Sequence, residues 1–83
     1  MKLLYFAWLR ERAGRAEETA DVPADVKTVA ALIEWLKRRG EGYRAAFADP
    51  ALVRVAVNQE YVKFDHPVRR GDEVAFFPPV TGG

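Results

Sequence analysis

Thr28-Val29-Ala30-Ala31-Leu32-Ile33-Glu34-Trp35-Leu36-Lys37-Arg38-Arg39-Gly40 is the stretch that decides the fold, because no other carries so clear a helical signal. Its apolar residues recur at the i, i+3, i+4 and i+7 spacing of one buried helical face: Val29, Leu32, Ile33 and Leu36. Thr28 is a good helix N-cap, and we expect Gly40 to end the helix in the left-handed conformation. The stretch therefore predicts one amphipathic helix.

The residues before this helix predict a β-hairpin. Residues 3–9 are apolar throughout and too few for a helix, which favours a central strand covered on both faces. We expect residues 10–14 to form a polar turn or a single helical turn that ends at Gly14. Residues 17–22 are more polar and predict an edge strand paired with the first strand.

The residues after the helix predict three more strands. Residues 43–48 are expected to form a short helical turn first. Valines then alternate with other residues over 53–57, which is strand periodicity, and residues 61–64 predict a brief strand. The last strand is predicted at residues 73–77, since Pro78-Pro79 removes two backbone donors.

The order of these elements predicts the fold class. A helix between the first hairpin and the later strands must cross one face of the sheet. We expect the two most apolar strands, the first and the last, to lie side by side and parallel at the centre. This is the α+β arrangement of the ubiquitin-like β-grasp: a mixed β-sheet with one main helix packed on one face. Residues 1–79 are expected to form this domain, and residues 80–83 a flexible C-terminal tail ending in Gly-Gly.

The composition excludes several classes of function. A chain of 83 residues, 49% hydrophobic, can bury one core but leaves little room for an internal pocket, so we expect it to act through its surface. There are no cysteines, and the single histidine, His66, is expected to be structural, so no metal site is predicted. A net charge of +1 is not typical of nucleic-acid-binding modules. The apolar run 3–9 is far shorter than the roughly 20 residues of a membrane span, and no cleavage region follows it, so we expect a cytoplasmic protein that binds no membrane.

The C-terminal residues Thr81-Gly82-Gly83 predict a reactive tail, with an idle terminus as the alternative. Residues 80–83 can extend about 13 Å, and glycine lacks a β-carbon, so the tail could enter a narrow channel. The α-carboxylate, with a reference pKa of about 3.5, is ionised and must be activated before acyl chemistry. The chain has no glycine-rich phosphate loop with a lysine, so ATP and Mg²⁺ are expected on an activating partner and no cofactor on this chain. An activated carbonyl could accept sulfur to give a thiocarboxylate, or an amine to give an amide.

Several motifs together carry a family resemblance. The most specific is Gly71-Asp72-Glu73-Val74-Ala75-Phe76-Phe77-Pro78-Pro79-Val80-Thr81-Gly82-Gly83. The others are Phe6-Ala7 with Arg10-Glu11, Thr28-Val29 with Leu32, Val57-Asn58-Gln59, and Phe64-Asp65-His66-Pro67. Over its whole length the chain resembles the small subunits of molybdopterin synthases, which implies a ubiquitin-like β-grasp sulfur carrier for molybdenum cofactor biosynthesis.

The resemblance implies a sequence of partners. An adenylyltransferase similar to ubiquitin-activating enzymes would form an acyl-adenylate on Gly83, and a sulfur donor protein would supply the sulfur of a thiocarboxylate. The loaded chain would join the large synthase subunit, in a heterotetramer, and insert Val80, Thr81 and Gly82 into its active site. Sulfur would pass to cyclic pyranopterin monophosphate, and two transfers would build the molybdopterin dithiolene. The chain alone would be a non-catalytic, sulfur-donating subunit, active only with the large subunit.

The residues expected at the partner interface surround the tail. Adjacent strand residues face opposite ways, so one of the two last phenylalanines enters the core with Val74, while Phe77 shares the other face with Ala75. The resemblance implies that the interface also includes Phe6 and Tyr61. We expect Arg10, as a docking charge, and Pro78 and Pro79 to belong to it as well. The alternatives are core packing for Phe6, Tyr61 and Phe77, and a surface ion pair for Arg10.

Three other functions remain open from the sequence. A carrier of the same fold could serve thiazole synthesis or tRNA thiolation, since such carriers share the Gly-Gly end. A ubiquitin-like modifier would use the same terminus to form isopeptide bonds with other proteins. An interaction module with an inert tail is the third.

Overall fold

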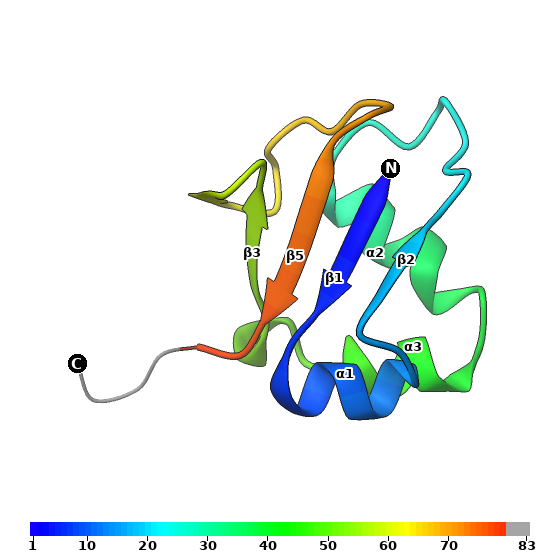
Figure 1. Ribbon diagram of the computed structural model, residues 1–83, viewed down its shortest axis with the longest axis vertical. Helices are drawn as coiled ribbons and strands as arrows, with labels where there is room; N and C mark the ends of the chain where they lie inside the picture. Colours follow the sequence, from blue (N-terminus) through cyan, green and yellow to red (C-terminus); the bar gives the residue numbers. More distant parts are fainter. Residues whose placement is uncertain (80–83) are drawn as a thin grey trace.

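Within residues 1–79, which the computed structural model describes, five strands form one mixed sheet in the order β2-β1-β5-β3-β4 (Figure 1). They are β1 (Lys2–Tyr5), β2 (Glu17–Thr19), β3 (Arg54–Val57), β4 (Glu60–Val62) and β5 (Glu73–Phe77). β1 and β5 are parallel neighbours, and the other pairs are antiparallel. The predicted central pair is confirmed, and so is the presence of the edge strand, but β2 covers only Glu17–Thr19 of the predicted residues 17–22. The predictions for residues 80–83 lie outside the described residues.

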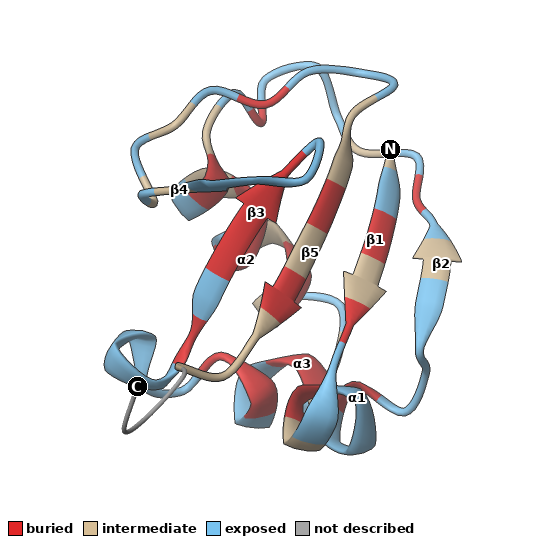
Figure 2. Ribbon diagram, turned by 60° about the vertical axis from the view of Figure 1, so that its left-hand side comes forward, coloured by how far each residue is buried: buried red, intermediate tan, exposed pale blue. Residues whose placement is uncertain are grey.

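The helices are α1 (Ala7–Ala13), α2 (Val29–Lys37) and α3 (Glu41–Ala46), with a 3₁₀ turn η1 (Pro50–Leu52). α2 lies across one face of the sheet, while α1 and α3 lie together at one end of it (Figures 1 and 2). Thr28 caps α2, since its hydroxyl accepts a hydrogen bond of 3.1 Å from the Ala31 N–H. The fold is the predicted ubiquitin-like β-grasp. Among the described residues, no helix has the length and apolarity needed to cross a membrane.

The first apolar run is not one strand, which corrects the prediction for residues 3–9. β1 ends at Tyr5, and the chain turns at Ala7, whose φ of 53° is in the left-handed region, into helix α1. Leu9 and Ala13, four residues apart, form the buried side of α1. Gly14, at φ 81°, ends the helix, as expected. Apolar residues of a short helix cannot be told from those of a strand until its packing is known.

The end of α2 is also corrected. The helix ends at Lys37, and the N–H groups of Arg38 and Arg39 bond to carbonyls of the preceding turn. Gly40 does not adopt the left-handed conformation: its φ of 163° is extended, and it caps the start of α3. The last turn of α2 satisfies its own carbonyls, so no left-handed residue is needed. Strand β4 spans Glu60–Val62 rather than 61–64.

The core lies between α2 and one face of the sheet. Val74 and Phe76 of β5 are fully buried there. The Phe76 ring stacks on Tyr5 with centroids 5.9 Å apart and meets the edge of Phe47 at 4.9 Å. Phe77 faces the other side, as predicted, because strand side chains alternate. This alternation places one aromatic of β5 on the face that α2 does not cover.

Candidate functional site

The candidate site is the sheet face opposite α2, at the end of β5. Phe77 pairs across the sheet with Arg54, and Ala56 pairs with Tyr61 on its other side. These residues therefore share one face. The rings of Tyr61 and Phe77 touch, with centroids 5.4 Å apart and planes at 46°. β3 lies between β5 and β4 in the sheet, and its register with both brings together two aromatics that are distant in sequence.

This face is unusually open for its apolar content. Tyr61 has 83% of its surface exposed, and Phe77 is half-buried. The two rings line a shallow hollow of about 200 Å³ together with Arg54, Val55 and Val62. Core packing is therefore excluded for Tyr61. Exposed aromatics of this kind are typical of protein–protein contact sites.

Phe6 lies beside the end of β5. Its N–H donates a hydrogen bond of 3.1 Å to the Phe76 carbonyl. Tyr5 is buried in the core, and Phe6, next in the extended chain, turns the opposite way and is 48% exposed. Core packing is therefore excluded for Phe6 as well. We call Phe6, Tyr61 and Phe77 the aromatic face.

Arg10 is exposed on α1, and no carboxylate within residues 1–79 forms an ion pair with it. Pro78 and Pro79 follow Phe77 and are half-buried. The contacts of all these residues with a partner stay predictions. The site residues Val80, Thr81, Gly82 and Gly83 lie outside the described residues.

Arg54 is a residue of this site that the sequence did not reveal. Its guanidinium donates hydrogen bonds of 3.2 Å to the Ala51 carbonyl and 3.1 Å to the Val53 carbonyl. These bonds hold a positive charge at the rim of the hollow between Tyr61 and Phe77. Alternation with Val53 and Val55 indicated that Arg54 points outward, but not which strand residue it opposes. Only the strand register brings it to Phe77.

A nearly buried carboxylate lies on the other face of the sheet. Glu18 has a side chain only 8% exposed and accepts hydrogen bonds from the hydroxyls of Tyr5 at 2.8 Å and Tyr43 at 2.6 Å. Arg39, at 3.0 Å, and Arg15, at 3.3 Å, form ion pairs with it. Burial tends to raise the pKa of Glu18, but the bonds from Tyr43, Tyr5 and Arg39 outweigh it and hold the pKa below its ordinary value. This cluster ties β1, β2 and α3 together.

Burial also raises the pKa values of the Tyr5 and Tyr43 hydroxyls, and the Glu18 carboxylate raises them further. Both tyrosines are thus held neutral, as hydrogen-bond donors. His66 has a structural place as predicted: its carbonyl accepts the Val29 N–H at the start of α2. Its Nδ1 lies 2.7 Å from the Pro67 carbonyl. Tyr5, Glu18 and Tyr43 lie on the core side of the sheet, so they hold the fold rather than serve the aromatic face.

Comparison with known proteins points to one family. The ThiS family model matches residues 3–83. The chain is 47% identical over 83 residues to the molybdopterin synthase sulfur carrier subunit of Escherichia coli (strain K12), with 100% of this chain and 99% of that protein covered.

Solved structures agree with this similarity. A putative molybdopterin converting factor subunit 1 from Pyrococcus furiosus matches with a TM-score of 0.75 and 36% identity over 95% of each chain. A chain in the protein–protein complex of subunits 1 and 2 of molybdopterin-converting factor from Helicobacter pylori shares the fold, with a TM-score of 0.64 and 18% identity over 99% of this chain and 96% of that one.

Proposed function

The chain belongs to the ThiS family, and on that premise we propose that it is the sulfur carrier subunit of a molybdopterin synthase, with Gly83 as the residue that carries the sulfur. The observation that carries the proposal is the aromatic face at the end of β5. It offers a partner an apolar surface beside the point where the chain leaves the sheet toward its two last glycines.

The chemistry follows from the carboxylate of Gly83. An activating adenylyltransferase, which binds ATP and Mg²⁺, lets this carboxylate attack the α-phosphate, so that pyrophosphate leaves and an acyl-adenylate forms. A sulfide-level nucleophile from a donor protein then displaces AMP and leaves a thiocarboxylate. The thiocarboxylate sulfur bonds to a carbon of cyclic pyranopterin monophosphate and displaces an oxygen substituent from that carbon. Water then hydrolyses the acyl link, which leaves the sulfur on the pterin as a thiolate and returns the glycine carboxylate. Two such transfers complete the dithiolene.

The small size of the chain is consistent with separate roles for its tail, which carries the sulfur, and its domain, which docks on the partner. The described residues fill a single core, which contains apolar residues from Leu3 to Phe76. The catalytic side chains are those of the large subunit, and this chain contributes its tail and a docking surface. In that complex Phe6, Tyr61 and Phe77 bury apolar area, while Arg10 and Arg54 offer positive charges at its edge. A heterotetramer with the large subunit and a cytoplasmic location stay predictions.

Intact-mass measurement tests the loading. The chain is co-expressed with a candidate adenylyltransferase and a sulfur donor, purified and weighed. We expect a gain equal to the replacement of one oxygen by sulfur, located at Gly83 by fragmentation. An unchanged mass in the presence of an active adenylyltransferase would contradict the carrier function, and isopeptide links to lysines of other proteins would indicate a modifier instead.

A reconstituted synthase tests the acceptor. The loaded chain is mixed with the candidate large subunit and cyclic pyranopterin monophosphate, and molybdopterin is measured as its fluorescent oxidation product. We expect product that requires both proteins. A loaded chain that gives no product here but thiolates a thiazole precursor or tRNA would assign it to one of those pathways.

A further inference from the structure

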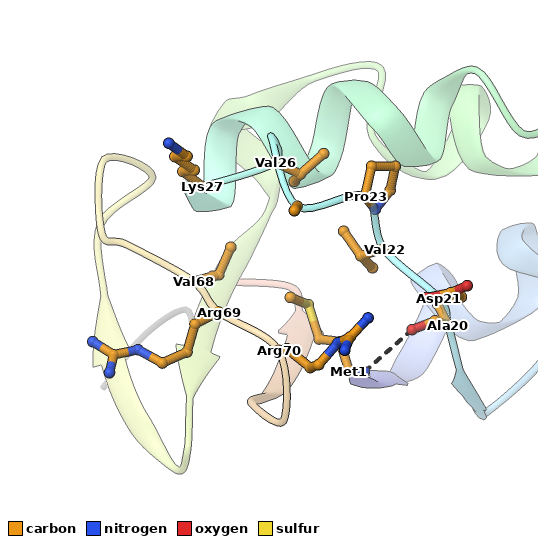
Figure 3. A pocket seen from close by; sticks show the side chains of 11 residues that line it. Met1, Ala20, Asp21, Val22, Pro23, Val26, Lys27, Val68, Arg69 and Arg70 are labelled. Atoms are coloured by element: carbon orange, nitrogen blue, oxygen red, sulfur yellow. Dashed lines mark hydrogen bonds between the residues drawn. The ribbon is translucent and has the colours of Figure 1, made fainter.

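A hollow of about 540 Å³ lies at the end of the sheet where β1 and β5 begin (Figure 3). The segment before α2 and the turn before β5 form its walls. Val26 and Val68 are buried in its floor, and Met1 and Val22 are half-buried beside them. We call this site the N-terminal hollow. Its volume is in the range of ligand sites, and its floor is apolar.

The rim of the hollow carries an excess of positive charge. Lys27, Arg69 and Arg70 line it, and Asp21 is the acid among its lining residues. None of the ion pairs found within residues 1–79 involves Lys27, Arg69 or Arg70. In Figure 3 the Arg70 side chain is directed toward Met1 and Val22, whereas Lys27 and Arg69 extend from the outer rim. Arg70 is thus the cation placed over the apolar floor.

Three of the backbone N–H groups around the hollow already have acceptors. Phosphate sites commonly use free backbone N–H groups at a turn or helix start. Here the N–H groups of Ala20, Val26 and Val68 already donate to carbonyls at 2.9 to 3.0 Å. The side chains of the hollow place cationic groups above apolar ones. That combination suits a carboxylate attached to an apolar body.

We propose that the N-terminal hollow binds a peptide segment of a partner protein in which an acidic side chain stands next to an apolar one. The carboxylate pairs with the fork of Arg70. The apolar side chain of the segment covers Val22, Val26 and Val68.

The N-terminal hollow is well separated from the aromatic face. β1 and β5 are parallel, so the hollow and the aromatic face lie at opposite ends of the same two strands (Figure 1). β5, with five residues, spans roughly 16 Å at 3.3 Å per residue. A protein held at the N-terminal hollow therefore leaves the exit of the chain at Pro79 uncovered. One protein can therefore bind the carrier at the N-terminal hollow while another binds and modifies its C-terminal tail.

Amide chemical-shift titration of the full chain tests the site. The probe is a blocked hexapeptide in which leucine alternates with glutamate, and the matched peptide has glutamine in place of each glutamate. We expect saturable shifts at residues 20–27 and 68–70 with the acidic peptide, and affinity at least about tenfold lower with the glutamine peptide, because the ion pair is lost. Equal binding of both peptides, no shifts, or inorganic phosphate displacing the acidic peptide would overturn the proposal.

Two variants sharpen the test. Arg70→Glu is expected to weaken binding of the acidic peptide at least about tenfold, while Arg38→Glu, at an exposed arginine outside the hollow, is expected to leave it unchanged. Thermal unfolding of both variants checks that they fold. Equal losses in the two variants, or none in Arg70→Glu, would refute the assignment. Sulfur loading of Gly83 is expected to proceed in Arg70→Glu as in the parent chain, so a failure of the carrier function would appear in both chains and separately from peptide binding.

Discussion

At the residue scale, the side chains of Tyr61 and Glu18 have opposite roles: one is exposed and available for binding, and the other is nearly buried and stabilises the fold. Tyr61 lies on the open face with 83% of its surface exposed and makes ring contact with Phe77 alone among the aromatics of residues 1–79. Glu18 is nearly buried and receives hydrogen bonds from two tyrosines. The Tyr61 side chain therefore contributes little to the stability of the fold and is available to a partner. The Glu18 side chain holds β1, β2 and α3 together.

Replacement of Tyr61 by alanine tests the aromatic face. Because Tyr61 is a large exposed aromatic beside Phe77, we expect Tyr61→Ala to weaken binding to the large synthase subunit by about 2 kcal/mol, which is roughly thirtyfold in Kd. The melting temperature is expected to change little, since the side chain is mostly exposed. Isothermal titration calorimetry with the candidate large subunit measures the affinity.

Leu52→Ala is the matched control, because Leu52 is 48% exposed and lies outside the aromatic face. We expect it to keep the affinity of the parent chain. Equal affinities of the Tyr61→Ala and parent chains would show that the partner binds another surface. Equal losses in both variants would point to a general effect of removing exposed apolar groups.

Glu18→Gln tests the buried cluster through its pH dependence. The folded-state pKa of Glu18 is lowered, so its stabilisation is present above the ordinary glutamate value of about 4.3 and is lost as the pH falls through the folded-state pKa. Hydrogen bonds to a charged group are worth about 2 kcal/mol. We therefore expect the variant to be about 2 kcal/mol less stable at pH 7 and the difference to shrink below a pH of about 4.

Urea denaturation at pH 7 and pH 3 measures this difference. Glu34→Gln is the control, because Glu34 has a side chain 65% exposed and forms a surface ion pair of 3.3 Å with Lys37. Such pairs contribute little to stability. A difference between the Glu18→Gln and parent chains that stays the same at both pH values would contradict the role of the charged carboxylate.

At the element scale, the packing of α1 against α3 decides how the first apolar run folds. Gly42 of α3 lies against the carbonyl of Arg12, and a β-carbon at position 42 would collide with that oxygen. Arg12 also donates to the Ala45 carbonyl at 3.2 Å. The close approach of these two short helices therefore depends on the absence of a side chain at Gly42.

Gly42→Ala tests this packing. The new methyl group would have to push backbone aside, so we expect a loss of about 2 kcal/mol and a melting temperature lower by roughly 10 °C. Gly40→Ala is the matched control, because a β-carbon there meets nothing within 4 Å and the residue is extended. Differential scanning calorimetry compares the three chains. If both variants melt together with the parent chain, the helices do not pack as closely as described.

At the scale of the whole molecule, the two proposals place function at the two ends of the central strands and leave the core between them. The buried core is completed by residues up to Phe76. We therefore expect deletion of Gly83 to leave the melting temperature unchanged and to abolish sulfur loading, as measured by intact mass after co-expression with the adenylyltransferase. A drop of several degrees would show that the terminal residues contribute to folding. Loading of the shortened chain would refute Gly83 as the sulfur-carrying residue.

The sequence by itself determined the elements whose signals are local. The helix start at Thr28 and the last strand at residues 73–77 follow from capping, periodicity and the two prolines, and all were confirmed. The parallel central pair followed from the order of elements and their apolarity. The motifs near Gly83 resembled one family, and the comparisons show that family.

Tertiary structure alone decided what depends on contacts between distant residues. The run after Tyr5 became a helix because Leu9 and Ala13 are buried only when α1 packs on α3. Tyr61 and Arg54 reached Phe77 through strand register, which a one-residue shift would reverse. Arg70 came to Met1 because two parallel strands begin at the same edge of the sheet. Local conformational preferences determine which segments form helices and strands. Only the packing of the whole chain determines which distant side chains come into contact.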